Sequence, residues 1–555
     1  MPYTYPRYAY QRPAEFTSGF GEHRVVVAGG GMVGLTMALA LAHEGLKVVL
    51  LDEDDTVSEG SRAICIAKRC LEIYQRLGLG RRLLAKGVTW NTGRVYFRDR
   101  QIYSFNLLPE EGHEYPAFIN IQQYYLEEYL VDACREAGVE LRWRNRVVGV
   151  EQHPDHVILS VETPEGRYRI AAEWLLACDG ARSFIRESMG LPFRGKVFRD
   201  RFLIADVRMH ASFPNERWFW FDPPFHRGQS VLLHRQPDDV WRIDFQLGME
   251  ADPEVERRPE RVIPRVRAML GPDVPFELEW VSVYTFRCRR LQRFVHGRTI
   301  FVGDSAHQVS PFGARGGNAG IQDADNLAWK LAAVLAGKAP EALLESYNAE
   351  RVAAADENIL NSTRSTDFIT PKSEAARAYR DAVLTLAEHY AFAQPFVNSG
   401  RLSRPAILSE SPLNYPKSAH WAGGLPLGAP ATDAPVQHNG KPDWLLHHLG
   451  DAFTLLCYGD PKSFAEAKKF ARANGLRLTI ITPEPSASVS GNGETHLHDS
   501  EGLVQRRYAL PEGGVILFRP DQHVSALFDR FDAGEVGAAL SHALAHPMMN
   551  MENVP

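Results

Sequence analysis

The sequence has few cysteines for its length, and none of them forms a Cys-x-x-Cys pair. Its 555 residues include six cysteines: Cys65, Cys70, Cys134, Cys178, Cys288 and Cys457. Their spacing excludes a zinc ribbon and a redox dithiol. So sparse a set is typical of a protein from a reducing compartment, where disulfides are rare.

Long apolar runs and clusters of positive charge are also missing. The apolar run at 35–42 is far shorter than the ~20 residues that a membrane-spanning helix needs, and the N-terminus has no apolar signal core. The net charge is −6 and no Lys/Arg stripe is present, which argues against nucleic-acid binding. We therefore expect a cytoplasmic protein that binds neither membranes nor nucleic acids.

What is present is the composition of an ordinary globular protein. The chain is 45% hydrophobic and 23% charged, which excludes long-range disorder. At about 150 residues per domain, its length predicts three or four domains.

The first informative pattern is a glycine-rich turn between two apolar strands. Residues 24–28 predict a buried strand, Gly29, Gly31 and Gly34 form a G-x-G-x-x-G turn, and a helix and a second strand lead to Asp52. In such a unit the glycines allow a tight turn, the approach of a pyrophosphate and close helix packing. The terminal acid hydrogen-bonds a ribose hydroxyl. The pattern predicts dinucleotide binding without distinguishing NAD from FAD.

Two later strands end in short acidic motifs. The strand in WLLACDGARSFIR delivers Asp179-Gly180, and the strand in TIFVGDSAHQVSPFGARGGNAGIQ delivers Gly303-Asp304. A helix is predicted at 317–336 from its apolar periodicity, with Gly337 and Pro340 ending it.

Together these motifs resemble those of the flavin-dependent aromatic hydroxylases of the 4-hydroxybenzoate hydroxylase and phenol hydroxylase family, the group A FAD monooxygenases. Members carry, in order, a G-x-G-x-x-G turn, an Arg-Ala pair (here Arg62-Ala63), a D-G motif and a G-D motif. The likeness spans roughly residues 24–400. It implies an α/β fold: a Rossmann-type FAD-binding domain with an inserted mixed β-sheet substrate domain.

The resemblance also implies the roles of the cofactor-binding residues. Asp304 would bind a ribityl hydroxyl of FAD, Arg62 the pyrophosphate region and Gln123 the central part of the cofactor, while the backbone of Val147 would meet adenine. In this family the D-G motif serves both FAD and NADH or NADPH, which binds only transiently. The isoalloxazine would meet the backbone amides of Gly316, Gly317 and Asn318, and the helix dipole there would stabilise the anionic reduced flavin.

Residues 196–285 lose the helix–strand alternation and predict an aromatic-rich sheet. In WRIDFQL, the side chains of Trp241, Ile243, Phe245 and Leu247 alternate with those of Arg242, Asp244 and Gln246. The polar side of this strand either meets solvent or lines a pocket, and base rates favour solvent.

The resemblance places His234, Gln236 and Asp244 where the 4-hydroxybenzoate enzyme clamps the carboxylate of its substrate with Ser, Arg and Tyr. Because an anion would face Asp244 without an arginine or tyrosine, we expect a neutral phenol, polyphenol or hydroxylated ring. Asp222 falls loosely near the phenol-activating tyrosine of the family. His234 is equally well explained as a hydrogen-bonded histidine of the sheet.

The loop before the predicted helix resembles the P-x-G-[KR]-G-x-N loop of the same enzyme. The carbonyl of Pro311 would accept the hydrogen bond of the substrate hydroxyl, and Arg315 would add positive potential beside the flavin.

The last part of the chain predicts a thioredoxin-like domain. Its strands and helices follow that order, and the phrase LFRPDQHV at 517–524 resembles the C-terminal domain of the longer phenol hydroxylase-type members. Cys457 stands alone, so this domain cannot perform dithiol chemistry, and we expect a structural or oligomeric role. The HLHD stretch at 496–499 suggests a metal site or, with more support, a solvated loop.

The resemblance predicts hydroxylation of a phenolic ring, ortho or para to its hydroxyl, with NAD(P)H and O₂ through a C4a-hydroperoxyflavin. Alternatives are a flavin oxygenase that epoxidises a polyketide-like ring or performs a Baeyer–Villiger insertion, a non-oxygenating FAD reductase, and a flavoprotein that serves as a binding subunit. A homodimer is possible. The expected division is a tail at 1–22, FAD-binding parts at 23–195 and 286–400, the substrate sheet at 196–285, a connector at 401–441 and the thioredoxin-like domain at 442–548.

Overall fold

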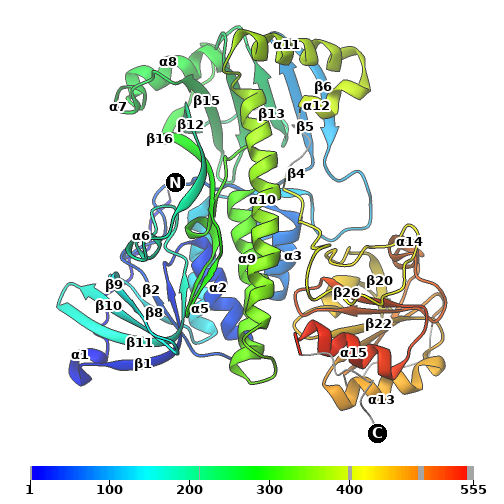
Figure 1. Ribbon diagram of the computed structural model, residues 1–555. Coiled ribbons are helices and arrows are strands. Elements are labelled where there is room, and N and C mark those ends of the chain that lie inside the picture. The colour runs from blue at the N-terminus through cyan, green and yellow to red at the C-terminus, as the bar shows by residue number, and fades with distance from the viewer. Residues whose placement is uncertain (1–2, 212, 398–402, 486–492, 547–555) are drawn as a thin grey trace.

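The computed structural model describes residues 3–211, 213–397, 403–485 and 493–546. Figure 1 shows two stacked parts, each with a large sheet, and a separate C-terminal part beside them. Two long helices stand between the lower large sheet and the C-terminal part, and one of them reaches up to the second sheet.

The first sheet is the predicted dinucleotide-binding sheet. β1 pairs in parallel with β2, Val25 opposite Val48, and on its other side with β11, Val25 opposite Trp174. The helix α2 (Met32–His43) connects β1 to β2, so the predicted strand–turn–helix–strand unit is confirmed. The strands, in sheet order, are β17 (Val295–His296), β18 (Thr299–Phe301), β11 (Gly166–Ala177), β1 (Gly21–Ala28), β2 (Val48–Leu51) and β8 (Glu140–Arg142), with β10 (Val157–Thr163) and β9 (Arg146–Gln152) joined to β11.

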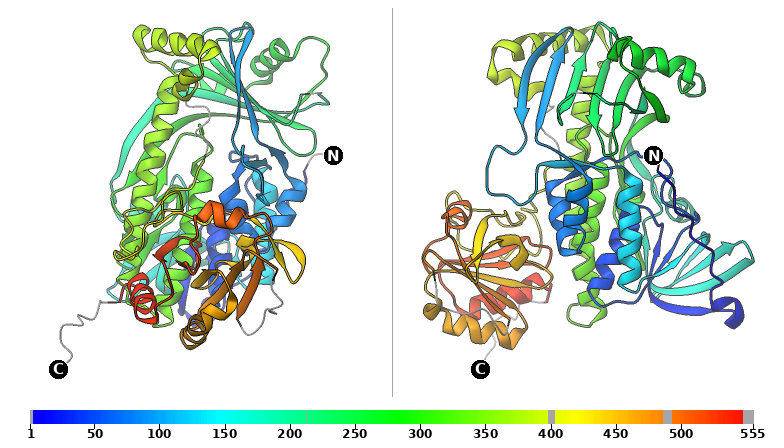
Figure 2. Two further views of the ribbon diagram at one scale, coloured as in Figure 1. Left: turned by 90° about the vertical axis from the view of Figure 1, so that its right-hand side faces the viewer. Right: turned by 180° about the vertical axis from the view of Figure 1, so that it is seen from behind.

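The second sheet is mixed, as predicted, but it takes in more of the chain than residues 196–285. Two of its strands come from 92–106, inside the first FAD-binding segment, and Figure 2 shows them beside the later strands. Arg217 of β13 pairs in parallel with Gly93 of β5, a long-range contact that local patterns do not reveal. In sheet order the strands are β19 (His307–Gln308), β16 (Glu277–Leu291), β12 (Phe193–Arg208), β15 (Val240–Gly248), β14 (Ser230–Arg235), β13 (Arg217–Phe221), β5 (Thr92–Phe97) and β6 (Arg100–Asn106).

Different elements pack on the two faces of the second sheet. Trp241, Ile243 and Phe245 of β15 pack with Val262 and Val266 of helix α8 (Pro259–Leu270). The opposite, polar side of β15 faces the interior of the molecule. A further three-stranded sheet, made of β3 (Cys65–Ala67), β7 (Phe118–Asn120) and β4 (Val88–Trp90), lies at the junction between the two large sheets.

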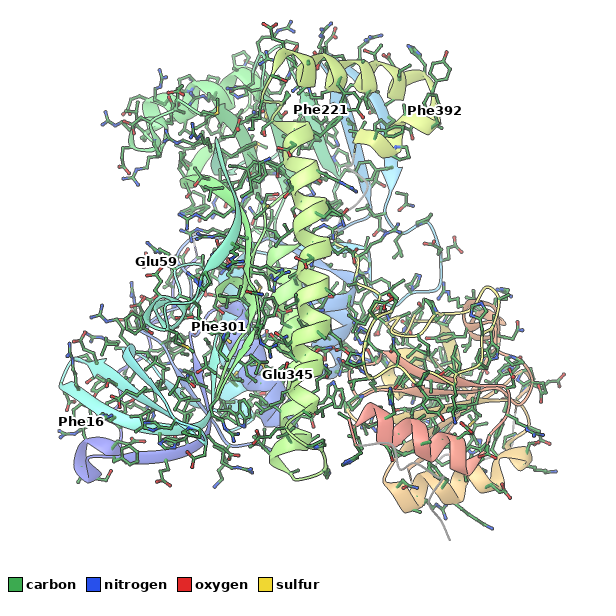
Figure 3. The ribbon with its side chains drawn as sticks, in the orientation of Figure 1. Phe16, Glu59, Phe221, Phe301, Glu345 and Phe392 are labelled. Carbon is green, nitrogen blue, oxygen red and sulfur yellow. The ribbon has the colours of Figure 1, made fainter. Side chains whose placement is uncertain are left out.

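Two helices link the parts. α9 (Gly316–Leu335) covers the predicted 317–336 segment, and α10 (Leu343–Ile369) extends upward to the second sheet. Figure 3 labels Phe301 in the lower sheet and Phe221 in the upper one, with α10 spanning the height between them. The other helices of these parts are α1 (Glu15–Ser18), α3 (Lys68–Arg76), α4 (Gly80–Lys86), α5 (Gln123–Glu136), α6 (Phe184–Ser188), α7 (Pro253–Glu256), α11 (Glu374–His389) and α12 (Gln394–Val397).

The C-terminal part contains the predicted strand, helix, strand and last helix, and it adds strands and a helix that were not predicted. Its sheet begins at Pro435 rather than at 442. Its strands, in sheet order, are β21 (Lys441–Trp444), β20 (Pro435–His438), β24 (Glu494–His498), β23 (Arg477–Thr482), β22 (Thr454–Tyr458), β25 (Val515–Phe518) and β26 (Val524–Phe528). The helices are α13 (Ala465–Asn474), α14 (Leu503–Tyr508) and α15 (Ala533–Ala543).

Two expectations for this part have clear outcomes. All six cysteines of the chain are free, Cys457 among them. The HLHD stretch forms most of β24 instead of a solvated loop, and His496 contacts Glu494. Within the part of the chain that the structure describes, neither His496 nor His498 belongs to a group of side chains placed to hold a metal.

One charged residue of the C-terminal part, Arg519, is buried against the central helices. Glu350 of α10 accepts hydrogen bonds from Lys330 of α9 at 2.6 Å and from Arg519 at 2.5 Å and 3.1 Å. All three side chains are fully buried. In the described parts of the chain, no helix combines the length and the apolar character needed to cross a membrane.

Candidate active site

The glycine turn lies tightly packed at the end of β1. Gly29 has φ of +107°, and a Cβ added there would come within 2.4 Å of the carbonyl oxygen of Cys178. A Cβ at Gly34 would come within 1.8 Å of the carbonyl oxygen of Gly29. Only glycine fits at these two positions, which leaves the loop backbone open for a ligand at the N-terminus of α2.

Asp52 follows β2 at this turn. One carboxylate oxygen accepts hydrogen bonds from the amide of Asp54 at 2.8 Å, and the other contacts the amide of Gly30. Burial raises the pKa of Asp52 to about 6. The side chain therefore braces the glycine loop directly, and the predicted ribose contact would use the lone pairs that remain.

Gln123 connects the Arg62-Ala63 segment to the same helix terminus. Its side-chain oxygen accepts from the amide of Ala63 at 3.2 Å, and its amide donates to Glu127 at 2.8 Å. Glu127 in turn accepts from the amide of Met32, the first residue of α2, at 3.1 Å. Glu127 was not predicted as a site residue, because the sequence shows it only as one acidic residue of the stretch that forms α5.

The two acidic motifs lie side by side because their strands are neighbours, with Ala177 of β11 opposite Phe301 of β18. One oxygen of Asp179 accepts from the amide of Ile185 at 3.0 Å, and its other oxygen is buried without a partner. The carboxylate of Asp304 lines the large cavity described below. Gly303 has φ of +67°, which allows the turn from the end of β18 to Asp304.

A buried ion network holds the Gly303-Asp304 turn against α9. Asp323 accepts from the amide of Gly303 at 3.1 Å, from His307 at 2.7 Å and from Arg351 at 2.6 Å. Burial alone would raise the pKa of Asp323, but His307 and Arg351 lower it to about 2. The sequence analysis did not single out Asp323, because a charged residue in a helix is usually on its solvated face.

The loop that precedes α9 is folded back on itself. The carbonyl of Pro311 already accepts from the amide of Ala314 at 3.0 Å, so only its second lone pair is available to a substrate. Asn318 accepts from the amide of Ala67 at 2.8 Å, and Arg315 donates to Asn358 at 2.8 Å. The first-turn amides of α9 have no partner within the helix, so they give the helix end a partial positive charge.

The loop before α9, its first turn, Arg62 and Asp304 meet side chains of the second sheet in a cavity of about 590 Å³. Its lower edge is formed by the first turn of α9 and by Arg62 and Asp304, and its upper wall by side chains of the second sheet. The glycine cradle, the acid at the strand end and the helix N-terminus fit the dinucleotide and flavin parts of FAD. The predicted residues that line the cavity are Arg62, His234, Asp244, Asp304, Pro311, Arg315, Gly316, Gly317 and Asn318.

Arg242 and Asp244 on the polar side of β15 line this cavity, so of the two alternatives for that side, solvent or a pocket, the structure supports the pocket. Arg242 forms a two-pronged ion pair with Asp206 of β12, with two N–O distances of 2.8 Å. Both side chains are almost fully buried. The strand is covered on both faces because its apolar side packs on α8 and its polar side is turned toward the central helices.

Asp244 and Tyr284 form the titratable pair in the upper wall. The hydroxyl of Tyr284 donates to Asp244 at 3.1 Å, and burial raises the pKa of Asp244 to about 6 although Arg242 opposes it. His234 lies in the same wall, and burial keeps the pKa of its imidazole well below the usual value. His234 is therefore neutral at pH 7, and its Nδ1 has no hydrogen-bond partner in the described structure.

The other predicted site residues do not line the cavity. They are Gly29, Gly31, Gly34, Asp52, Gln123, Val147, Asp179, Gly180, Gly303, Asp222 and Gln236. Gln236 is buried behind the cavity, where its amide donates to Asp206 at 3.2 Å, so it supports the ion pair of Arg242 instead of a ligand. Asp222 lies in a turn, where it accepts from the amide of Gly228 at 2.7 Å. Val147 lies on β9, opposite Val161. The loose matching of Asp222 explains its misplacement, since the intervening loop shifts the register.

The structure supplies the arginine and tyrosine that matching by sequence position left out. Arg217 comes from β13 and Tyr284 from β16, both outside the β14–β15 hairpin, and both line the cavity. In the sequence, each of these two residues appears only as a single charged or polar residue within an aromatic-rich strand. The cavity wall therefore contains an arginine and a tyrosine, although matching by sequence position gave neither.

Comparison with known proteins agrees with this site. The family described as FAD binding domain matches residues 22–362, and the HcaD C-terminal domain matches residues 435–543. A 6-methylpretetramide 4-monooxygenase of Streptomyces rimosus is 31% identical over 91% of this chain and 90% of its own. A 3-(3-hydroxy-phenyl)propionate/3-hydroxycinnamic acid hydroxylase of Mycolicibacterium smegmatis is 27% identical over 93% and 92% of the two chains.

Solved structures show the same fold. The flavin-dependent monooxygenase PieE, in complex with FAD and substrate, aligns over 95% of this chain and 99% of its own, with a TM-score of 0.79 and 22% identity. The family match covers more than half of the chain, and it includes the glycine turn, the Arg-Ala pair and both acidic motifs. This chain therefore belongs to the FAD-binding family of flavin-dependent aromatic hydroxylases.

Proposed function

We propose that this protein hydroxylates a phenolic ring ortho or para to its hydroxyl with NADH or NADPH and O₂, and that Asp244 accepts the proton of the phenol. The observation that supports the proposal is the cavity that joins five of the predicted flavin-binding residues, Arg62, Asp304, Gly316, Gly317 and Asn318, to the Asp244–Tyr284 pair. Bound FAD would supply the oxygen activation, and the protein provides position, proton transfer and exclusion of water.

The lower edge of the cavity would hold the cofactor. Asp304 offers a carboxylate to the ribityl chain, and Arg62 offers a cation to the pyrophosphate. The amides of Gly316, Gly317 and Asn318 provide a partial positive charge where a reduced flavin is anionic. We retain Gly29, Gly31, Gly34, Asp52, Gln123, Val147, Asp179, Gly180 and Gly303 as further contacts or supports of the cofactor.

The upper wall would hold the substrate ring. Asp244 with a pKa of about 6 is largely ionised at pH 7, so it can accept a proton. A phenol whose proton moves toward Asp244 becomes more phenolate-like, which raises the electron density of its ortho and para carbons. Neutral His234, with its partnerless Nδ1, offers a second hydrogen bond to a ring substituent.

The test is a panel of phenols scored by substrate-stimulated NAD(P)H consumption and by the mass of the product formed under ¹⁸O₂. The proposal expects one labelled oxygen atom in the product. NAD(P)H consumption without a labelled product would instead favour the non-oxygenating reductase, and a protein purified without flavin would contradict the cofactor assignment.

Three broader expectations stay predictions from the sequence. They are a cytoplasmic location, a homodimer, and a structural or oligomeric role for the C-terminal domain. The buried contacts of Arg519 with Glu350 support a structural role, because they join that domain to α10.

A further inference from the structure

Arg217 stands out among the cavity side chains because its charge has no counterpart in direct contact. It projects from β13, it is 8% exposed, and its Nη1 is buried with no hydrogen-bond partner. Across the described residues, no carboxylate forms an ion pair with it. Burying an unpaired guanidinium is costly, and such groups in native structures are usually paired or bind a ligand.

The neighbouring charged side chains already have hydrogen-bond partners. Arg242 is paired with Asp206 through two hydrogen bonds, and Asp244 accepts the hydroxyl of Tyr284. The charge of Arg217 interacts electrostatically with both Asp244 and His234, and it lowers the pKa of each. Arg217 therefore lies in the same chamber as the proposed phenol-binding groups, but it is not held by them.

The cavity as a whole is cationic. Among its lining side chains the arginines outnumber the aspartates, which are Asp244 and Asp304 only. The pyrophosphate of FAD would take up some of this positive charge at the lower edge, near Arg62. Arg217 lies in the sheet wall instead, so its charge remains for the substrate.

We propose that Arg217 anchors an anionic substituent of the substrate, so that the preferred substrates are phenols that carry a carboxylate side chain. This inference rests on the proposed function, and it replaces the neutral phenol that the sequence predicted. A planar guanidinium binds a carboxylate through two parallel hydrogen bonds, which fixes the orientation of the ring as well as its affinity. With the side chain held at Arg217, the ring hydroxyl is left to Asp244.

The first test uses the wild-type holoenzyme and two probes that differ only in charge. These are 3-(3-hydroxyphenyl)propionate and its primary carboxamide, with binding followed by the perturbation of the flavin spectrum. We expect the acid to bind about 10- to 100-fold more tightly, the range of one charge-assisted pair. Equal affinity for the acid and the amide would overturn the proposal without any variant.

The second test assigns the preference to this residue. Arg217→Gln should weaken binding of the acid by the same factor and change that of the amide less than threefold, and Arg217→Lys should restore part of the loss. Arg208→Gln is the matched control, since Arg208 lies in the same sheet but is paired with Glu279 at 2.8 Å and does not line the cavity.

The remaining outcomes separate this proposal from the proposed function. If Arg217→Gln weakens the acid and the amide equally and shifts the pH profile of turnover, Arg217 binds the phenolate oxygen and the anchor is wrong. If the acid binds selectively but stimulates no NAD(P)H consumption or labelled product, the proposed function fails while the anchor stands. Flavin content and thermal unfolding of each variant show whether it is folded. If Arg217→Gln is not folded, the relative affinities of the wild-type holoenzyme for the acid and the amide test the proposal.

Discussion

The hydroxyl of Tyr284 donates a hydrogen bond of 3.1 Å to Oδ1 of Asp244, in a place where burial raises the pKa of that carboxyl to about 6. Each residue comes from a different strand, β16 for Tyr284 and β15 for Asp244, and these strands are separated in the sheet by β12. The pair is therefore a product of the sheet, and it makes the upper wall of the cavity a site for proton transfer.

Replacing Asp244 by Asn should lower kcat/KM by about 100-fold or more, the usual effect of losing a general base. In the wild type, kcat/KM should rise with pH as Asp244 ionises near pH 6, and this limb should disappear in the variant. Asp239→Asn, on the exposed turn between β14 and β15, is the control. An unchanged acid limb in Asp244→Asn would mean that another group accepts the proton.

Replacing Tyr284 by Phe should move the acid limb of kcat/KM to higher pH. The hydrogen bond from Tyr284 stabilises ionised Asp244, so its loss raises the pKa of the carboxyl further. The measurement is the pH profile of kcat/KM, because a purely structural role would lower activity at every pH alike. Tyr390→Phe, at an exposed tyrosine outside the cavity, should leave the profile in place.

Replacing Asp304 by Ala should give a protein that purifies with little FAD. Asp304 is the acid at the end of β18 that lines the cavity beside the first turn of α9. The ratio of flavin to protein absorbance measures the effect directly. The control is Asp356→Ala, which removes an exposed carboxylate of α10 that pairs with Arg290 of β16, and this variant should keep its flavin. A normal flavin content in Asp304→Ala would refute the assignment.

Replacing Glu350 by Gln should lower the free energy of unfolding by about 3–5 kcal/mol, because Arg519 and Lys330 would lose their buried counter-charge. Denaturant unfolding of the holoenzyme measures it. Glu345→Gln on the same helix, labelled in Figure 3, is the control. Its partner Arg293 is half-exposed, so a loss of no more than about 1 kcal/mol is expected there. Equal losses in the two variants would show that the buried network adds no particular stability.

Much of the cofactor half of the site was open to prediction, because it depends on short local motifs. Gly29 and Gly34 occupy positions where no side chain fits, and that need is written into a strand, a turn and a helix within about 30 residues. Asp304 and the first turn of α9 follow the same logic at the end of another strand. By contrast, Asp222 was placed by matching across a loop, where no local constraint holds the register.

The substrate half could not be predicted in the same way. Arg217, Tyr284 and Asp206 come from three strands outside the β14–β15 hairpin, and the pairing of β13 with β5 joins segments about 120 residues apart. The sequence of a strand shows only that polar and apolar side chains alternate between its two faces. The polar side of β15 lines a cavity because the tertiary structure covers both faces of the strand.

The sequence alone predicts the dinucleotide turn, the acidic residues at the strand ends, the helix that begins at the proposed flavin site and the lack of any dithiol. Each of these depends on backbone geometry or spacing over a few residues. The charge of the substrate chamber depends on the tertiary structure. It arises where strands from distant segments meet, and the buried position of Arg217 without a partner exists only once the sheet is assembled. Burial then determines the chemistry, because removal from water is what raises the pKa of Asp244 and leaves the charge of Arg217 in need of a ligand.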